Sequence, residues 1–419
     1  MKRIAIISSC DTKQKEAGFM AQCLRDYGVE PLVVDMSIGL GQPSGADISR
    51  EEVFAAVGLN WDEIRSKTKG ELMALMTEAM RATILKLYRD GRINGVMAAG
   101  GVQNTTVAMS AMQLLPIGVP KVIASTVACG SKPFASVVGL RDIVVLPSIS
   151  DFTGLNMMTR TILSNACACA AGMVLHAGQM PQKPACPVVG VSLMGITNEG
   201  CCEAIDELER LGVEAIGFHT TGVGGQIMEQ LALDGQLDGI LDMTTHEITS
   251  EYFGGGFSYG AKNRLTAPLK AGIPMVVSVG GLDFVDFDKE HFPPRMEQRV
   301  YNMHNEQLAH IKILPDEALE VGKIFAARFD SAAEPVTLVF PTEGMRKNTR
   351  AGENLYAPQT DAALLETIRA NLSPDVRVET LEGNLNDRDW GRRIARLMVR
   401  ELRERGVNVP EIEEGRQMP

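Results

Sequence analysis

The sequence predicts an α/β protein made of two doubly wound, Rossmann-like lobes with parallel sheets. Short aliphatic runs alternate with amphipathic stretches of helical periodicity, which is the pattern of repeated βαβ units. The chain has 419 residues, more than one hydrophobic core usually organises. Gly (41) and Met (22) are plentiful while aromatic residues make up only 5%, a composition that suits aliphatic parallel sheets joined by tight turns.

In the first lobe, placed at residues 1–178, aliphatic runs predict five strands with helices between them. The strands are expected at Arg3–Ser9, Pro31–Asp35, Gly95–Ala99, Val122–Ser125 and Ile143–Pro147. The helices are expected at Lys13–Tyr27, Trp61–Asp90 and near Thr105–Leu114. Asn156–His176 reads as a long, Ala-rich helix, and its thin polar stripe predicts burial in an interdomain or dimer region.

Residues 179–187 are predicted to be a linker, because the stretch GQMPQKPACP (178–187) holds three prolines and a glycine. The alternation restarts in a second lobe, placed at residues 188–409, and an acidic tail at 410–419 is expected to fray. The second-lobe strands are expected at Val188–Leu193, Ala215–His219, Gly239–Met243, Met275–Val279, Val336–Phe340 and Val376–Leu381. The second-lobe helices are expected at Glu199–Leu211, Gly225–Asp234, Pro315–Phe329, Thr360–Ala370 and Arg388–Arg405.

Composition argues against several classes of partner. The net charge is −11, and Lys and Arg form no cluster with interleaved aromatics, so nucleic acid is not expected. No apolar stretch is expected to reach the roughly 18–20 residues of a membrane span, and Met1–Ser8 reads as a buried strand instead of a signal peptide. Eight cysteines without a C-x-x-C pair indicate a reduced, cytoplasmic protein.

The loop after the third strand is the strongest candidate for an anion site. Gly100 and Gly101 let the backbone approach a ligand, while Asn104, Thr105 and Thr106 offer donors at a helix N-terminus. The alternative is a glycine turn with a Thr N-cap. The loop is not a Walker loop, because G-x-x-x-x-G-K-[ST] is absent.

Other polar residues are expected at the same edge, because ligands of open parallel sheets bind beyond the carboxyl ends of the strands. Asp11 and Thr12 follow the first strand and could equally cap the next helix. Lys13 opposes the helix dipole, a conflict that a bound anion would relieve. Ser125 and Thr126 add hydroxyl groups after the fourth strand.

The second lobe carries a matching glycine loop and several titratable residues. Thr221, Gly222, Gly224 and Gly225 would grip the other end of an extended ligand. His219, Glu247 and His304 fall at predicted strand ends or loops. They could bind a divalent metal such as Zn²⁺ or Mn²⁺, act as acid and base, or simply be capping and hydrogen-bonded core residues.

Motifs along the whole chain resemble the Tm-one-like ATP-binding domain family, typified by a plant tobamovirus-resistance protein. In the first lobe they are DTK (11–13), AAGG (98–101), NTT (104–106), STVACG (125–130) and SDFTGLN (150–156). In the second they are FHTTGVGG (218–225), LDMTTHE (241–247), VSVGGLDFVDF (277–287), HNEQ (304–307), FPTEG (340–344) and NLND (384–387). The resemblance implies two Rossmann-like lobes with ATP between them, in a homodimer.

Three functions follow as hypotheses. The first is an ATP- or nucleotide-binding protein whose phosphates lie on the Gly100–Gly101 and Gly222–Gly225 loops, in a cleft between the lobes. The second is a catabolic lyase or hydrolase, with or without a bound metal, in which His219, Glu247 and His304 act on a phosphorylated or carboxylated metabolite. The third is a non-catalytic inhibitor of a partner protein. Bulky replacement of Gly101 or Gly224 is predicted to abolish ligand binding without unfolding the chain.

Overall fold

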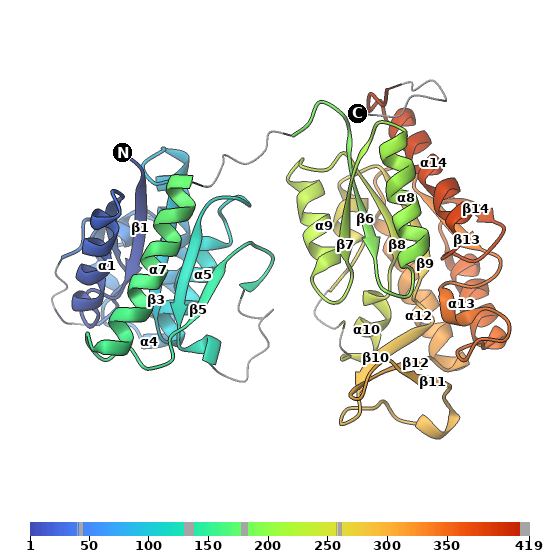
Figure 1. The fold of residues 1–419 in the computed structure, drawn as a ribbon, viewed down its shortest axis with the longest axis horizontal. Helices are drawn as coiled ribbons and strands as arrows, with labels where there is room; N and C mark the ends of the chain where they lie inside the picture. Colours follow the sequence, from blue (N-terminus) through green and yellow to red (C-terminus); the bar gives the residue numbers. More distant parts are fainter. Residues whose placement is uncertain are drawn as a thin grey trace. The chain divides into compact units, whose positions relative to one another are not determined.

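A computed structural model describes residues 1–39, 41, 45–129, 138–176, 183–256, 258 and 262–410. The chain divides into two compact units, Met1–Pro181 and Gln182–Pro419, called here the N-terminal and C-terminal units. Each unit is a Rossmann-like α/β layer structure around a parallel sheet (Figure 1), which confirms the predicted fold class. Residues 179–182 of the predicted linker and 411–419 of the predicted tail lie outside the described residues.

The N-terminal unit carries a five-stranded parallel sheet in the order β2-β1-β3-β4-β5. Its strands are β1 (Arg3–Ser8), β2 (Glu30–Asp35), β3 (Gly95–Gly100), β4 (Lys121–Ser125) and β5 (Val144–Pro147). Its helices are α1 (Gln14–Asp26), α2 (Arg50–Ala55), α3 (Trp61–Ile64), α4 (Lys69–Arg89), α5 (Val102–Met112), the 3₁₀ turn η1 (Val127–Cys129) and α7 (Met157–His176).

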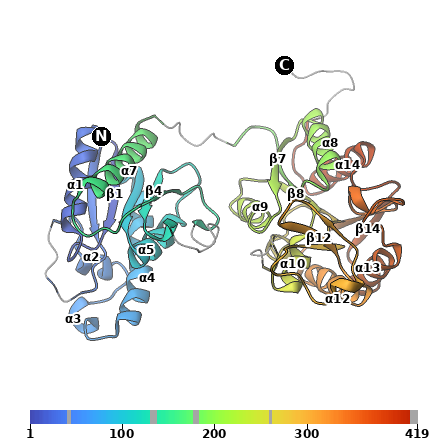
Figure 2. The same ribbon diagram turned by 60° about the horizontal axis from the view of Figure 1, so that its bottom comes forward.

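Alternation of side chains along these strands builds two apolar layers. Ile4, Ile6 and Met97 pack against α1 and α7, whereas Ala5, Ile7 and their neighbours pack against α2, α4 and α5. Figure 2 shows α1 and α7 on one side of the sheet and α4 and α5 on the other. The sheet is therefore buried on both faces, as its near-continuous aliphatic strands predict.

Two helix predictions in this unit need correction. The helix predicted at Trp61–Asp90 is two helices, α3 and α4, because Thr68 forms a capping box with Glu71 and starts a new helix. By length and composition alone α7 is apolar enough to cross a membrane, contrary to the expectation that no stretch is. Its buried residues pack against α1, β3 and β4 inside the N-terminal unit, whereas Met157 and Leu175 are exposed on that unit. The predicted place of this helix in an interdomain or dimer region stays a prediction.

The C-terminal unit has a six-stranded parallel sheet in the order β14-β13-β9-β8-β6-β7. Helices α8 and α14 cover one face, and α9, α11, α12 and α13 cover the other. The strands are β6 (Val188–Leu193), β7 (Glu214–His219), β8 (Gly239–Thr244), β9 (Met275–Gly280), β13 (Thr337–Pro341) and β14 (Arg377–Leu381). The helices are α8 (Asn198–Arg210), α9 (Gly224–Leu233), α10 (Glu247–Phe253), α11 (Thr266–Lys270), α12 (Pro315–Arg328), α13 (Pro358–Asn371), α14 (Arg388–Glu404) and the 3₁₀ turns η2 (Met296–Gln298), η3 (Phe329–Ser331) and η4 (Lys347–Thr349).

A small antiparallel sheet, which the sequence did not predict, is inserted after β9. Its strands β10 (Phe284–Asp288), β11 (Tyr301–Met303) and β12 (Leu308–Lys312) lie in the order β10-β12-β11. The register pairs His310 with Asp286 on one side and with Asn302 on the other. Residues directly opposite in an antiparallel pair share a face, so these three side chains form one cross-strand row.

Each parallel sheet has a topological switch point beside its first strand. In the N-terminal unit β1 lies between β2 and β3, and in the C-terminal unit β6 lies between β7 and β8. Strand order reverses at these points, which opens a crevice at the carboxyl ends of the flanking strands. The loops after β1 and β3, and after β6 and β8, are therefore the places to search for a site.

Candidate functional site

In the N-terminal unit the two loops at the switch point contact each other directly. The Ser9 Oγ, just after β1, donates a hydrogen bond to the Asn104 Oδ1 in α5 at 3.0 Å. The Asn104 Nδ2 donates to the carbonyl of Ala99 at 3.2 Å. The loops after β1 and β3, both predicted to bind a ligand, are thus brought together at one edge of the sheet.

Several predicted ligand residues at this edge serve to hold the loops. Gly100 has φ +153°, and a Cβ there would lie 2.7 Å from the Cβ of Asn104. The hydroxyls of Thr105 and Ser125 lie 2.7 Å apart, and both side chains are buried. Gly100, Asn104, Thr105 and Ser125 therefore fix the shape of the loops.

Other residues of the same loops stay open to solvent. A Cβ on Gly101 would meet only the Thr126 Oγ1, at 3.7 Å. The start of α5 is accessible, since Val102 is 61% exposed. Thr106 is exposed and its hydroxyl donates to the carbonyl of Val102 at 2.9 Å.

The loop after β1 spans the start of α1. The backbone N–H of Asp11 donates to the Ser37 Oγ at 3.1 Å, and Thr12 is exposed. The Lys13 Nζ donates to the carbonyl of Phe152, which ties the segment after β5 to this loop. Asp11, Thr12 and Lys13 are all at the carboxyl edge of the sheet, beside the Ser9–Asn104 contact.

The helices that follow β1 and β3 lack side-chain caps. Helices α2 and α4 begin with complete capping boxes at Ser49 and Thr68. At α1 and α5 the N-cap residues, Lys13 and Gly101, provide no side-chain cap. The first N–H groups of α1 and α5 have no acceptor in their own helix and remain available to an anion.

Unpartnered polar atoms and backbone strain occur at the same edge. The Ser8 Oγ, the Asp35 Oδ2 and the Ser150 Oγ are buried without a hydrogen-bond partner among the described residues. Ile149, after β5, has φ 63° and is 64% exposed. A β-branched residue in the left-handed region is strained, and such strain gathers at functional sites.

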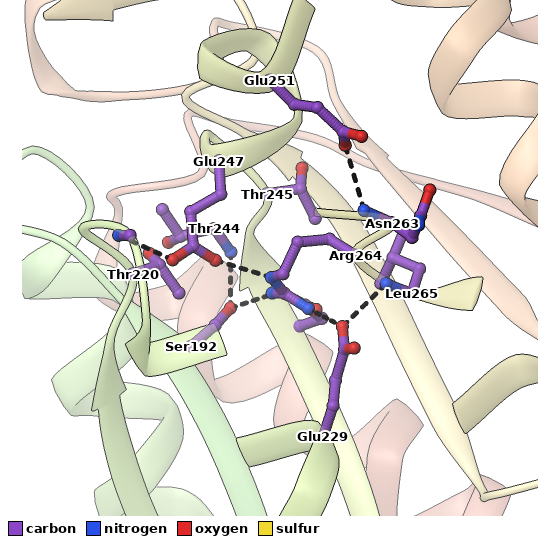
Figure 3. A network of polar contacts seen from close by, with 12 residues as sticks. Ser192, Thr220, Glu229, Thr244, Thr245, Glu247, Glu251, Asn263, Arg264 and Leu265 are labelled. Atoms are coloured by element: carbon purple, nitrogen blue, oxygen red, sulfur yellow. Dashed lines mark hydrogen bonds and ion pairs between the residues drawn. The ribbon is translucent and has the colours of Figure 1, made fainter. Parts of the chain in front are cut away.

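The C-terminal unit fills the corresponding region with its own ion network. Arg264 is fully buried, with its Nη2 2.8 Å from the Asp242 Oδ2 and its Nε 2.6 Å from the Glu247 Oε2. Its Nη1 pairs with Glu229, which also accepts the N–H of Leu265 at 2.7 Å. Figure 3 shows the guanidinium of Arg264 between Glu229 and Glu247, near Ser192.

The charges of this network are unbalanced, since one cation faces three buried carboxyl groups. Burial raises the pKa of Glu229, although Arg264 opposes that rise. Burial disfavours the charged form of Arg264, but Asp242, Glu229 and Glu247 outweigh it and hold the pKa of Arg264 well above its usual range. The guanidinium therefore stays charged and fixes the positions of three strand-end or helix side chains.

Contacts with this network and with the neighbouring backbone account for the glycines of the second loop without a ligand. The N–H of Gly222 donates to the Glu247 Oε1 at 2.8 Å. A Cβ on Gly225 would lie 2.1 Å from the Arg264 Nε, and one on Gly224 would lie 1.9 Å from the carbonyl oxygen of His219. The Thr221 N–H donates to that same carbonyl at 3.0 Å. Close packing thus requires glycine at 224 and 225, and the prediction that Gly224 can be enlarged without unfolding needs correction.

The structure does not bring His219, Glu247 and His304 together as a metal site. His219 is exposed at the end of β7, and Glu247 is buried against Arg264. His304, just after β11, stacks on His310 of β12. No group of three or more His, Cys, Asp or Glu side chains in the described part of the chain is arranged to hold a metal ion. For the same reason His219, Glu247 and His304 do not form a shared acid–base site.

Sequence reasoning missed a second charged cluster, where strands β9 and β13 end. Asp283 is buried between Arg346 and Lys312; burial opposes its ionisation, but the two cations hold the pKa of Asp283 well below its usual range. Lys312 also pairs with Asp361 at 2.6 Å. The position of Asp283 just after a predicted strand marked it as a candidate in the sequence. Nothing in the sequence shows that Arg346, Lys312 and Asp361 lie beside it.

We expect His310 to remain neutral well below the usual range of histidine. Burial, reinforced by the nearby charge of Arg346, lowers the pKa of His310 from 6.5 to about 4. In the unfolded chain His310 takes up a proton near pH 6.5, whereas in the folded chain it does so only near pH 4. His310 therefore lowers the free energy of unfolding as the pH falls from about 6.5 to about 4. Asp361, whose pKa burial raises to about 6, acts in the opposite direction.

An NMR titration of histidine-labelled protein checks the lowered pKa of His310 directly. It follows the protonation of the imidazole itself, whereas the pH dependence of stability would combine the effects of His310 and Asp361. The His310 resonances should move with a midpoint near pH 4, and the His310→Asn variant should identify them. A midpoint above pH 6 would contradict the described burial.

Comparisons with known proteins identify relatives of this chain along its length. Two family models match, described as Uncharacterised protein family (UPF0261) N-terminal domain over residues 2–179 and C-terminal domain over residues 186–402. A UPF0261 protein of Clostridium tetani is 32% identical over 403 residues, covering 95% of this chain and 98% of its own.

Two further matches are more limited. The ToMV resistance protein Tm-1(GCR237) of Solanum lycopersicum is 32% identical over 413 residues; the match covers 93% of this chain but 54% of that protein. Among solved structures, a UDP-GlcNAc 2-epimerase from Neisseria meningitidis matches 66% of this chain and 82% of its own at 9% identity, with a TM-score of 0.22. That score is too low to carry an inference about function.

Proposed function

The chain belongs to the UPF0261 family, and from this premise and its N-terminal switch point we propose that it binds a phosphate-bearing small molecule, with ATP or another nucleotide as the first candidate. The resemblance to Tm-one-like proteins seen in the sequence is confirmed by the tomato relatives. The phosphates would lie on the loops after β1 and β3.

The open start of α5 at the switch point is the observation that carries the proposal. The N–H groups of Val102 and Gln103 have no acceptor in the helix, both residues are exposed, and Gly101 offers no side chain to cap them. Helix starts with free N–H groups and a positive dipole end favour phosphate. The missing Cβ of Gly101 leaves room for an oxygen atom to approach.

Side chains near the start of α5 also favour an anionic ligand, although the chain as a whole has a net charge of −11. Lys13, the N-cap residue of α1, supplies a cation against the helix dipole. The unpartnered Ser8 Oγ and Asp35 Oδ2, at the ends of β1 and β2, could hydrogen-bond ligand hydroxyl groups or bound water. Unpaired buried polar atoms cost about 1–3 kcal/mol each, so a partner supplied by a ligand would stabilise this edge.

Replacing Gly101 with leucine should abolish ligand-induced stabilisation while leaving the fold intact. The new side chain would project beside the α5 N–H groups, and the backbone at Gly101 is of ordinary φ (−82°) with only Thr126 nearby. Thermal unfolding with ATP, ADP, ribose 5-phosphate or inorganic phosphate measures the effect. A ligand at a hundred times its dissociation constant stabilises by about 2.7 kcal/mol.

The tryptophans allow the two units to be followed separately. The chain has two, Trp61 in the N-terminal unit and Trp390 in the C-terminal unit, and both are buried. In a Trp390→Phe background the stabilisation should appear in Trp61 fluorescence. Gly70→Leu is the matched control and should keep the full response, because Gly70 is exposed and a Cβ added there would meet no other side chain within 4 Å. If none of the four ligands stabilises the chain, or if Gly101→Leu still responds, the proposed site is wrong.

The cytoplasmic location and the homodimer stay predictions. All seven cysteines whose side chains are described are free, which suits a reducing compartment. The dimer follows only from the family resemblance, and light scattering at the mass of a single chain would contradict it.

A further inference from the structure

Arg346 is a buried cation whose guanidinium is incompletely paired. It follows β13 and is 0% exposed. Its Nε donates to both carboxylate oxygens of Asp283, at 3.0 and 2.9 Å, whereas its Nη1 has no hydrogen-bond or ion-pair partner among the described residues. A buried N–H group without an acceptor is costly, so this one calls for a partner that the described chain does not supply.

Arg346 is also held rigidly, so it has little freedom to find a partner by itself. Its carbonyl accepts hydrogen bonds from the Thr349 Oγ1 at 2.9 Å and the Asn384 Nδ2 at 3.2 Å. Its guanidinium carbon lies 4.2 Å from the centre of the Phe284 ring. A donor fixed in this way is preorganised for an acceptor that arrives from outside.

His310, which contacts Phe284, and His304, which stacks on His310, have unused ring nitrogens. His310 meets the Phe284 ring edge-on, with centroids 5.1 Å apart, and stacks on His304 at 4.8 Å. Neither imidazole makes a hydrogen bond to any described residue. Asn302, in register with His310 on the neighbouring strand, likewise has no described side-chain partner. His310 is buried, whereas His304 is exposed and covers it.

We propose that Arg346 and His310 form a second ligand site, in the C-terminal unit, for the oxyanion group of a small molecule, a carboxylate or a phosphate. Guanidinium and imidazole N–H groups are the donors that such oxygens prefer. The exposed His304 ring turns away to admit the oxyanion. Asp283 and Asp361 balance Arg346 and Lys312. Asp286, opposite His310 in the small sheet, is already hydrogen-bonded to His246 and Ser258.

The site is independent of the proposal for the N-terminal unit. It uses different residues on a different sheet, and neither result predicts the other. The small sheet β10-β12-β11 gains a role from it, because that insertion brings His310 to the Phe284 ring over which Arg346 lies.

Histidine-labelled protein observed by NMR tests the site, with inorganic phosphate and acetate as the two probes at constant pH and ionic strength. One or both should shift the His304 and His310 resonances saturably, with no saturable change at the exposed His176 and His291. Arg346→Lys keeps the charge that Asp283 needs but loses the planar fork, so binding should weaken about tenfold or more. His304→Ala should bind at least as well as the unmodified chain.

Arg369→Lys is the matched control. Arg369 also lies over a phenylalanine, 4.1 Å from the centre of the Phe340 ring, but on the surface, and its replacement should leave the response unchanged. Trp390 fluorescence checks folding, and if Arg346→Lys does not fold, His310→Asn should show the same weakening. Absence of a saturable shift with both anions, or an undiminished response in the folded Arg346→Lys or His310→Asn variant, would overturn the proposal.

Discussion

Replacing Arg264 with leucine is expected to unfold the C-terminal unit. The substitution removes the single cation that faces Asp242, Glu247 and Glu229, all of them buried. Breaking one buried ion pair from one side costs about 3–5 kcal/mol, and three carboxyl groups lose their partner here. The free energy of unfolding of a domain is about 5–15 kcal/mol in total. The stabilisation lost in this variant is therefore comparable to the whole stability of the C-terminal unit.

The effect should be confined to one unit, which the tryptophans can reveal. In a Trp61→Phe background, Trp390 fluorescence should report an unfolded environment without denaturant, while Trp61 in a Trp390→Phe background should still unfold cooperatively. The matched control is Arg400→Leu, which removes an exposed arginine that also faces two carboxylates, Glu379 and Glu404. Exposed pairs contribute about 0–1 kcal/mol, so the control should remain folded. A stable Arg264→Leu variant would mean that the three carboxyl groups are not gathered around one cation.

Adding a single methyl group at Gly225 should destabilise the C-terminal unit by about 3 kcal/mol or more, from overpacking and a disturbed ion pair. The new Cβ would lie 2.1 Å from the Arg264 Nε and 2.2 Å from the Glu247 Oε2. Neither atom can withdraw easily, because Arg264 is held by three carboxyl groups and Glu247 also accepts the Gly222 N–H. Urea unfolding followed through Trp390 measures the loss.

The contrasting control is Gly101→Ala in the N-terminal unit, followed through Trp61. Its Cβ would meet one atom at 3.7 Å, an ordinary van der Waals contact, so stability should change by less than about 1 kcal/mol. The two glycine loops look alike in the sequence but differ in what surrounds them. If Gly225→Ala proved as harmless as Gly101→Ala, the loop at 222–225 would have space for a ligand after all.

Most of the architecture could be predicted, because it rests on local pattern. The aliphatic runs at Arg3–Ser9 and Gly95–Ala99 correspond to β1 and β3 within a residue or two, and the strands of the second lobe agree equally well. A parallel sheet buried on both faces leaves a continuous apolar run for each strand, which is a strong signal. The small sheet escaped prediction because β11 has three residues and its strands mix polar and apolar side chains on one face.

The candidate site was less predictable, because it depends on contacts between distant segments. The loops at Asp11 and Gly101 were found from their position after strands, which the fold converts into proximity. Arg264 gave no such signal: its partners Glu229, Asp242 and Glu247 come from α9, β8 and α10, and nothing in the spacing shows that they meet. The set His219, Glu247 and His304 failed as a metal site for the same reason, since strand-end position does not say which way a side chain turns.

A crystal structure of the full chain soaked with ATP tests the central claim most directly. The claim predicts phosphate oxygens within about 3 Å of the N–H groups of Val102 and Gln103, with the Lys13 ammonium nearby. Phosphates bound elsewhere on the chain, with the start of α5 left to solvent, would contradict it.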